Sequence, residues 1–288
     1  MTARLSSVIL ATLAILVALA ATDGDPRPTA LSASPAVATI YQANDPVGLM
    51  VTSGGWAYCE QMRPVARRTH YTLLCGRYAS DGYVGPGLRS KRHLDWGNPL
   101  YLARFAEIVA GLHRRVGGKL VLVGVSYSGF GVATLAAHHP ALHPDRLIVI
   151  DSYFDLVVRR RLLPDWHETA REIDDEVKRS PTSLRQRSAN ARELTRLVRS
   201  GTDVTVVWSV SDDERRRFNG ATCSREASAA TLARVALLLR RPVPAWVTRS
   251  KHGANLWRYG VSIVHGSNPG RKVVFRPGTI PAGSFCRS

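Results

Sequence analysis

The sequence predicts an α/β fold in which helices cover both faces of a mostly parallel sheet. Short runs of consecutive apolar, often β-branched residues alternate with longer segments that have helical apolar spacing. The short runs are apolar at successive positions, as strands buried on both faces require. The chain has 288 residues, of which 45% are hydrophobic and 21% charged, so we expect one large core in a single domain with an insertion.

Residues 1–20 predict a secretory signal. Arg4 precedes a long apolar run, and the small residues Ala-Leu-Ala at 18–20 provide a cleavage site. An uncleaved anchor is the alternative, since a membrane helix needs ~20 apolar residues. Both interpretations predict that the globular part is secreted or extracytoplasmic. Residues 21–38 are rich in Pro, Ala and Ser without periodicity, which predicts a linker before a domain over 39–288.

The alternation is clearest in the first half of that domain. Apolar runs predict strands, and helical spacing predicts the segments between them. The predicted strands are 47–52, 70–75, 119–125 and 146–151, and the predicted helices are 59–68, 99–116 and 129–139.

Residues 152–200 interrupt this pattern with long, charged and helical sequence, including 168–179 and 188–199. We expect an inserted helical cap there. The alternation then resumes, and the C-terminal tail over 259–288 contains VSIVH and KVVF, which predict a terminal hairpin. The resumed alternation consists of strands at 203–210 and 244–248 with a helix at 225–240 between them.

A serine on a sharp turn follows the most continuous strand, in the sequence LVLVGVSYSGFG. Ser126 has the small residues Gly124 and Ser128 two positions away on either side, and a helix begins directly afterwards. Such a turn lifts the hydroxyl above the sheet and directs the helix N-terminus at the reacting oxygen. The alternative is a Gly/Ser turn that only starts a helix.

This turn resembles the GxSxG nucleophile elbow of the α/β hydrolases, with Ser128 at the second small position. The resemblance covers roughly residues 40–258 and implies an α/β-hydrolase fold with Ser126 as nucleophile. A serine at this position argues against the branches of the family that use aspartate, such as haloalkane dehalogenases and epoxide hydrolases.

The family's chain order places an acid and then a histidine after the nucleophile. Asp212 follows the strand VTVVWSV, which resembles the family's strand ending W-G-x-x-D, and it is our first candidate for the acid. Asp151, at the end of the strand after the nucleophile, is the alternative. His252 stands in a loop just after the strand PAWVT and is the predicted base, oriented by the acid.

An oxyanion hole requires two N–H groups directed at the reacting oxygen. The backbone of Tyr127, directly after the nucleophile, is expected to supply one. The sequence SGGW resembles the family's His-Gly-x oxyanion turn, with Ser53 in place of His. That resemblance implies Gly55 as the second donor and Trp56 as its alternative.

Four cysteines, an even number in a chain predicted to be exported, indicate disulfides, although four buried thiols are the alternative. From the strand ends that the fold would bring together, we predict Cys59–Cys75 and Cys223–Cys286. The sequence has neither a CxxC motif nor a His/Cys cluster with zinc spacing, so we expect no metal and no cofactor.

The formal net charge is +17, arginines dominate the basic residues, and many of them fall between residues 159 and 217. These lie in helical sequence among acidic residues, without the interleaved aromatics of a single-strand nucleic-acid platform. No helix-turn-helix, RRM or zinc-finger signature accompanies them. We therefore expect a solvated basic face that can contact anionic envelope surfaces, and no specific nucleic-acid partner.

The predicted function is hydrolysis of a small-molecule or lipid-like carboxylic ester through an acyl-enzyme. Three alternatives stay open. The elbow GVSYSG also resembles the GVSYG elbow of secreted prolyl and tripeptidyl aminopeptidases, whose substrate amine is held by acidic cap residues. Acyl transfer is the second alternative, and a non-catalytic basic binding protein of the cell envelope is the third. The acidic residues for an aminopeptidase would be Glu172, Asp174, Asp175 and Glu176.

Overall fold

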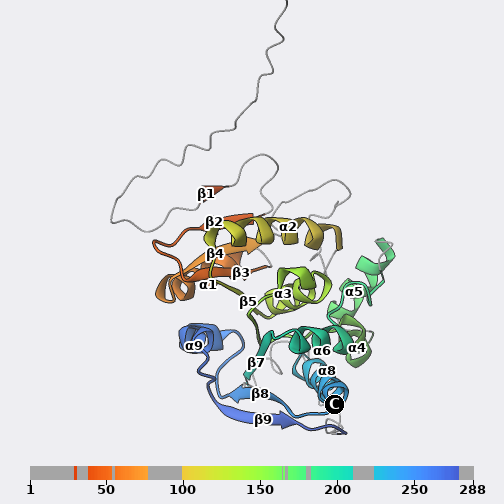
Figure 1. Cartoon of the computed structure of the whole chain (residues 1–288). Coiled ribbons are helices and arrows are strands. Elements are labelled where there is room, and N and C mark those ends of the chain that lie inside the picture. The colour runs from red at the N-terminus through yellow and green to blue at the C-terminus, as the bar shows by residue number, and fades with distance from the viewer. Residues whose placement is uncertain are drawn as a thin grey trace, which may run out of the picture.

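The computed structural model describes residues 29–30, 38–53, 56–76, 99–163, 165, 168–179, 183–209 and 224–278. These residues form one nine-stranded sheet with helices packed on both of its faces (Figure 1). The predicted fold class, a mostly parallel and doubly covered sheet, is confirmed.

The strands follow one another across the sheet in the order β1-β2-β4-β3-β5-β6-β7-β8-β9. Strands β3 to β8 run parallel, whereas β1, β2 and β9 are antiparallel to their neighbours. The carboxyl ends of the parallel strands therefore lie at one edge of the sheet. The bounds are β1 Thr29–Ala30, β2 Ala38–Tyr41, β3 Gly48–Thr52, β4 Tyr71–Gly76, β5 Lys119–Val125, β6 Arg146–Ile150, β7 Asp203–Ser209, β8 Val243–Thr248 and β9 Arg271–Phe275.

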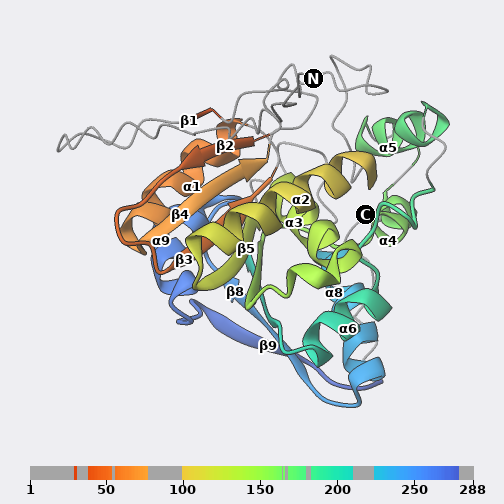
Figure 2. The same cartoon turned by 45° about the horizontal axis from the view of Figure 1, so that its top comes forward.

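Two groups of helices cover the sheet. Helices α1 and α9 pack on one face and on each other, while α2, α3 and α8 pack on the opposite face. Figure 2 shows α2 and α3 crossing that second face. The bounds are α1 Trp56–Arg68, α2 Pro99–Val116, α3 Tyr127–His138, α4 Leu156–Leu162, α5 Glu168–Arg179, α6 Ala191–Arg199, α8 Ser224–Leu239 and α9 Ala254–Val264.

Helical periodicity correctly predicts the bounds of α2 and α5, and the continuous apolar run correctly predicts β5. In α2 the residues Leu102, Phe105, Val109 and Leu112 recur every three or four positions, and all four are buried. The buried stripe explains why helical spacing in the sequence predicts this helix, since its apolar face packs against the sheet.

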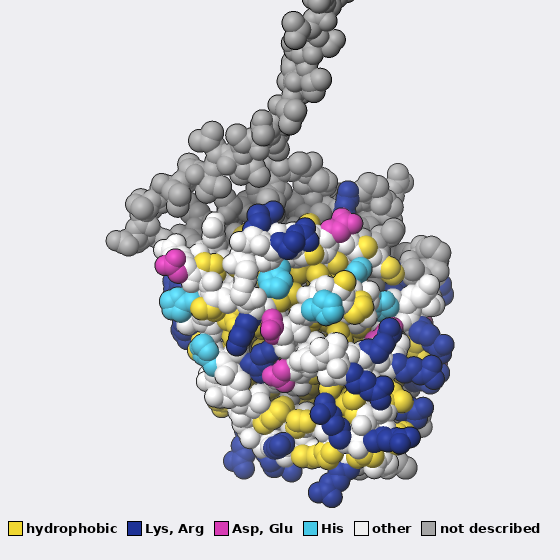
Figure 3. Space-filling view, in the orientation of Figure 1, with side chains coloured by type: hydrophobic (Ala, Val, Ile, Leu, Met, Phe, Trp, Pro, Cys, Tyr) yellow, Lys and Arg dark blue, Asp and Glu magenta, His cyan; other side chains and the backbone are white. Residues whose placement is uncertain are grey.

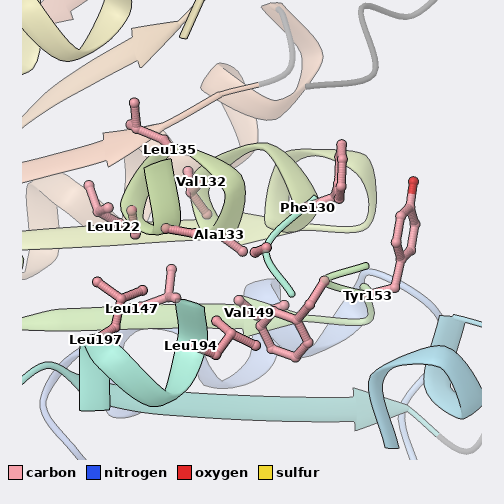
Figure 4. Packing of buried hydrophobic residues seen from close by; sticks show 14 of the residues in the cluster. Leu122, Phe130, Val132, Ala133, Leu135, Leu147, Val149, Tyr153, Leu194 and Leu197 are labelled. Carbon is pink, nitrogen blue, oxygen red and sulfur yellow. The ribbon is translucent and has the colours of Figure 1, made fainter. Parts of the chain in front are cut away.

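The larger core lies on the α2, α3 and α8 side of the sheet. Figure 4 shows strand side chains packed against both α3 and α6, which belong to the same helical layer. The strands contribute Leu122, Leu147 and Val149, α3 contributes Phe130, Val132, Ala133 and Leu135, and α6 contributes Leu194 and Leu197.

The predicted cap region contains α4, α5 and α6. Helix α6 contacts α3 and α8 and buries Leu194 and Leu197 in the core, so it belongs to the helical layer on the sheet. Helix α5 lies at an outer corner of the molecule (Figure 2). The guanidinium of Arg160 links α4 to α5 by donating to both carboxylate oxygens of Asp174, each at 2.8 Å.

The predicted C-terminal hairpin is wrong. The segment VSIV forms the end of α9, and KVVF lies in β9, which pairs with β8 and not with the preceding segment. In α9 the residues Leu256, Gly260 and Ile263 are buried at helical spacing. Gly260 allows α9 to approach α1 closely, since a Cβ there would lie 2.8 Å from Val65 Cγ2.

The predicted Cys59–Cys75 disulfide is not formed in the structure. Both cysteines are buried and belong to the same apolar cluster between the sheet and α1, but no disulfide joins them. Each packs there as a small hydrophobic side chain, which is ordinary for buried cysteine. Cys223 and Cys286, the other predicted pair, lie outside the described residues.

The predicted signal, residues 1–20, lies outside the described residues, as does most of the predicted linker. Two linker residues, Thr29–Ala30, form β1 and pair with β2. None of the described helices is both long and apolar enough to cross a membrane. Secretion and the alternative of an uncleaved anchor therefore stay predictions.

One arginine at the amino end of β6 holds the far end of α9. The Arg146 guanidinium donates from Nη1 to the carbonyl oxygens of Ile263 and Val264 at 2.9 and 2.7 Å. It also donates to Asp203 Oδ2 at 2.8 Å and to Thr205 Oγ1 at 3.0 Å, both in β7. A cation at a helix C-terminus satisfies the last carbonyls and opposes the negative end of the helix dipole.

We expect Arg146→Ala to lower the free energy of unfolding by about 2–3 kcal/mol, because it removes charge-assisted hydrogen bonds to the last carbonyls of α9 and to two side chains of β7. Chemical denaturation measures this loss. Arg115→Ala, at an exposed position at the end of α2, is the matched control and is expected to change stability by less than about 0.5 kcal/mol. Equal effects of the two substitutions would contradict the role assigned to Arg146.

Candidate active site

Ser126 occupies a strained turn between β5 and α3. Its φ of 51° and ψ of −125° lie outside the regions that a non-glycine residue usually adopts. The Ser126 N–H donates to the carbonyl oxygen of Ile150 at 2.9 Å, which ties the turn to β6. Helix α3 begins at Tyr127, so the serine stands between a buried strand and a helix N-terminus, and it is half-exposed.

The turn requires very small residues on both sides of the serine, because other atoms lie close to the backbone there. A Cβ at Gly124 would lie 2.4 Å from the backbone of Ser128, and one at Gly129 would lie 2.7 Å from Ser152 Cβ. Both positions therefore exclude any larger residue without a backbone shift. This requirement explains the glycines on each side of the predicted nucleophile.

Ser128, the departure from the GxSxG pattern, has a specific partner. Its hydroxyl lies 2.8 Å from the hydroxyl of Thr52 at the end of β3, and both side chains are fully buried. The Ser53 hydroxyl donates to the Ser128 carbonyl oxygen at 3.4 Å. The serine thus connects the elbow to the strand end that precedes the predicted oxyanion turn, a link that glycine would not make.

We expect Ser128→Ala and Thr52→Val each to lower the free energy of unfolding by about 1–3 kcal/mol, because each leaves the other hydroxyl buried without its partner. The double variant replaces both hydroxyls, so it is expected to lose clearly less than the sum of the single losses. Urea denaturation of the four proteins measures the coupling. Additive losses would show that the two hydroxyls do not stabilise each other.

Asp151 stands at the carboxyl end of β6 and is 5% exposed. It too has a positive φ, 48°, and its N–H donates to the carbonyl oxygen of Val207 in β7 at 2.9 Å. Its Oδ1 accepts hydrogen bonds from the backbone N–H and the hydroxyl of Ser209. Its Oδ2 accepts from the N–H of Gly253 at 2.9 Å. The carboxylate therefore joins the ends of β6 and β7 to the loop after β8.

His252 lies in that loop, between β8 and α9. Its half-buried side chain has a buried Nδ1 atom and interacts electrostatically with Asp151. The next residue, Gly253, has a φ of 74°, and a Cβ there would lie 3.8 Å from Val125 Cγ1. The histidine loop therefore packs against the residue that precedes Ser126, and the base and nucleophile candidates share one sheet edge.

Burial raises the pKa of the Asp151 carboxyl above its usual range. The nearby His252 imidazole and the hydrogen bonds from Ser209 and Gly253 act in the opposite direction and favour the ionised form. Such a buried carboxylate with directed donors and a neighbouring imidazole is typical of an acid that orients a catalytic histidine.

Aromatic side chains extend from the elbow toward α4. The rings of Tyr127 and Phe130 lie 6.2 Å apart, and Phe130 stacks on Tyr153 with a centroid separation of 5.1 Å. The guanidinium of Arg159 lies 4.2 Å from the centroid of the Tyr153 ring, and its Nη1 donates to the hydroxyl of Ser224 at 2.6 Å. The elbow therefore adjoins a row of buried aromatic side chains.

The structure brings together several of the residues that the sequence singled out. Ser126 follows β5, the alternative acid Asp151 follows the neighbouring β6, and His252 lies in the loop after β8, at the same edge of the sheet. Tyr127 begins α3, where its N–H belongs to the first turn, and Trp56 begins α1. Gly55 and Asp212 lie outside the described residues, so the predicted oxyanion turn and the first candidate for the acid stay predictions.

Two residues that position the site are not predicted from the sequence. Ser209 donates two hydrogen bonds to Asp151, and the hydroxyl of Thr52 contacts that of Ser128 in the first turn of α3. Each is the last residue of a parallel strand, in the runs GLMVT and DVTVVWS. A hydroxyl at the carboxyl end of an otherwise apolar strand was the available signal.

The strand order, the antiparallel β2, the serine elbow after β5 and the histidine after β8 occur together. The chain has the α/β-hydrolase fold. Comparison with known protein families and with curated proteins finds no match to this sequence.

Among solved structures, the chain is similar to esterases and lipases. One is a membrane phospholipase A described as a bacterial virulence factor (TM-score 0.48, 17% identity, 83% of this chain and 85% of that one). Another is MGS-MChE2, an α/β hydrolase from the metagenome of Mar Chica lagoon sediments (0.48, 13%, 83% and 96%). A third is a carboxylesterase structure from Nitrososphaera gargenis (0.44, 13%, 83% and 97%). These similarities concern the fold and not the substrate.

Proposed function

We propose that this protein, which has the α/β-hydrolase fold, is a serine hydrolase that cleaves a carboxylic ester through an acyl-enzyme. The observation that carries the proposal is the strained, half-exposed Ser126 at the sheet edge where the His252 loop packs against Val125. A strained residue held by surrounding structure is a common feature of catalytic sites. The substrate class is a small-molecule or lipid-like ester.

In the proposed reaction, His252 accepts the Ser126 hydroxyl proton while the serine oxygen attacks the ester carbonyl carbon. The tetrahedral oxyanion accepts hydrogen bonds from the N–H groups of Tyr127 and Gly55. The intermediate then releases the alcohol, which takes the proton from His252, and the acyl group stays on Ser126. Water repeats the sequence, with His252 again accepting and returning a proton, and releases the carboxylic acid.

Two carboxylates compete for the role of the acid. The contacts of Asp151 with Gly253 and its interaction with the His252 imidazole support Asp151. Asp212, the first candidate from the sequence, follows β7 by three residues. We propose Asp151 as the acid on the strength of its contacts, and the experiment below separates the two.

The ion pairs of two acidic residues in α5 favour ester hydrolysis over the aminopeptidase alternative. Asp174 is engaged by Arg160, whose hydrogen bonds lower the pKa of the Asp174 carboxyl. Asp175 lies 3.6 Å from the ammonium of Lys178. Asp174 and Asp175, two of the four acidic residues that an aminopeptidase would use, therefore already have cationic partners that would compete with a substrate amine.

We expect a fluorophosphonate probe to label the wild-type protein and not the Ser126→Ala variant, because the probe reacts with an activated serine. With p-nitrophenyl esters, Ser126→Ala and His252→Ala should each lower kcat by several orders of magnitude. The double variant should be little worse than either, since residues that act as one unit are strongly non-additive.

Labelling that persists in Ser126→Ala would identify a different nucleophile. Multiplicative losses in the double variant would refute the joint action of Ser126 and His252. Absence of labelling in the folded wild type would favour the non-catalytic binding protein.

Exchange of each carboxylate for its amide decides the acid. We expect Asp151→Asn to lower kcat by about 10²–10⁴-fold, because the imidazole loses the charge that orients and stabilises it. Asp212→Asn should retain most of the activity. Ester hydrolysis is measured on both variants, with thermal unfolding as the check that each is folded. The opposite ranking would assign the acid to Asp212.

A further inference from the structure

Two rows of side chains on and beside α6 and α8 face solvent. In α6 the exposed residues Arg192, Arg196 and Arg199 recur at spacings of four and three, so they share one side of the helix. The second row consists of Arg234 and Leu237, three positions apart in α8, and of Arg240 and Arg241 in the turn that follows the helix; all four are exposed.

The two rows form one continuous surface. Helices α6 and α8 pack side by side, and Arg199 Nη2 donates to the carbonyl oxygen of Leu238 at 3.0 Å. Figure 3 shows Lys and Arg side chains gathered over this side of the molecule. We call this surface the arginine face. It consists of Arg192, Arg196, Arg199, Arg234, Leu237, Arg240 and Arg241.

Little negative charge accompanies the arginine face. The acidic residues of α6 and α8 are Glu193 and Glu226. The Glu193 carboxylate, 13% exposed, accepts the N–H of Asn190 in a capping box and lies 3.9 Å from Arg196. Across residues 224–278 the sequence has ten Lys or Arg and a single acidic residue. The positive charge therefore stays available to an external anion.

Three guanidinium groups of the arginine face have no polar partner in the described part of the chain. Within those residues, no ion pair and no side-chain hydrogen bond engages Arg192, Arg234 or Arg241. Like charges on adjoining helices repel one another, and this repulsion destabilises the folded protein by a small amount. A bound anionic surface would remove that cost.

We propose that the arginine face docks on a lipid bilayer with anionic headgroups. Leu237 is 43% exposed in the middle of the arginines, so the face combines cationic groups with an apolar side chain. That combination suits the headgroup boundary of a bilayer, where arginine stems bury and guanidinium groups reach the headgroups. Docking of this face requires neither Ser126 nor the proposed hydrolysis.

Nucleic acid fits the arginine face less well. The face has no aromatic side chain on which a base could stack. The major groove of duplex DNA admits a single helix, whereas α6 and α8 lie side by side and neither protrudes alone.

The test measures co-sedimentation with vesicles of phosphatidylcholine alone and of phosphatidylcholine mixed with phosphatidylglycerol. The wild type should bind the mixed vesicles, and binding should weaken as NaCl increases. The triple variant Arg192→Gln, Arg234→Gln, Arg241→Gln should bind about a hundred-fold more weakly, since each arginine near an anionic surface contributes roughly five-fold. Within the described ranges, these three side chains make no hydrogen bond or ion pair that the substitutions would remove.

The matched control is Arg68→Gln, Arg114→Gln, Arg115→Gln, which removes the same charge from exposed positions at the ends of α1 and α2. It should bind within a few-fold of the wild type. Equal weakening in both triple variants would show a net-charge effect and overturn the proposal. Unchanged binding of the first variant would overturn it as well, and so would tighter binding to a DNA duplex than to the mixed vesicles.

Leu237→Asn tests the apolar contribution separately. It keeps every positive charge, and we expect it to weaken vesicle binding several-fold without changing the salt dependence. Hydrolysis of a soluble ester and thermal unfolding are followed in all variants. Unchanged values there separate a failure of docking from a failure of the proposed hydrolysis.

Discussion

Three donors from two separate segments converge on the Asp151 carboxylate. The N–H and hydroxyl of Ser209 come from the end of β7, and the N–H of Gly253 comes from the loop after β8. A buried carboxylate is stable only with such partners, and buried N–H groups need an acceptor in the same way. The position of His252 next to Gly253 therefore depends on a carboxylate that β6 supplies. The ends of β6 and β7 and the loop after β8 form one site because the Asp151 carboxylate accepts the hydrogen bonds that the other two segments donate.

The same backbone device occurs on two adjacent strands. Ser126 and Asp151 both have positive φ directly after a parallel strand, and each donates its N–H to the next strand, to Ile150 and Val207 respectively. A strained residue of this kind persists only where the surrounding structure holds it. The parallel sheet supplies that support, and Gly124 and the Ser128–Thr52 hydrogen bond supply it on the helix side.

The excess of positive charge is distributed over the structure in two different ways. Along the edge strand β9, Arg271 and Lys272 are exposed, and charged side chains on an edge strand discourage pairing with other chains. On α6 and α8 the arginines form a two-helix surface with Leu237 among them, and no strand edge there needs protection. The sequence analysis treated the basic residues as one solvated population. The structure separates them because helices distant in sequence pack together.

Local patterns in the sequence were sufficient for most elements and for the sharp turn at Ser126. The apolar run of β5, the stripe of α2 and the small residues around Ser126 are each contained within about twenty neighbouring positions, where periodicity and sterics act directly. The segment VSIVH favours a strand in the sequence because a short apolar run fits either structure, and only the packing of α9 against α1 decides for a helix. The contacts of Asp151 with Ser209 and Gly253 are equally non-local, since chain order does not reveal which backbone groups a carboxylate meets. Residues near in sequence determine local conformation, whereas the contacts of Asp151 and the arginine face arise only when distant strands and helices are brought side by side.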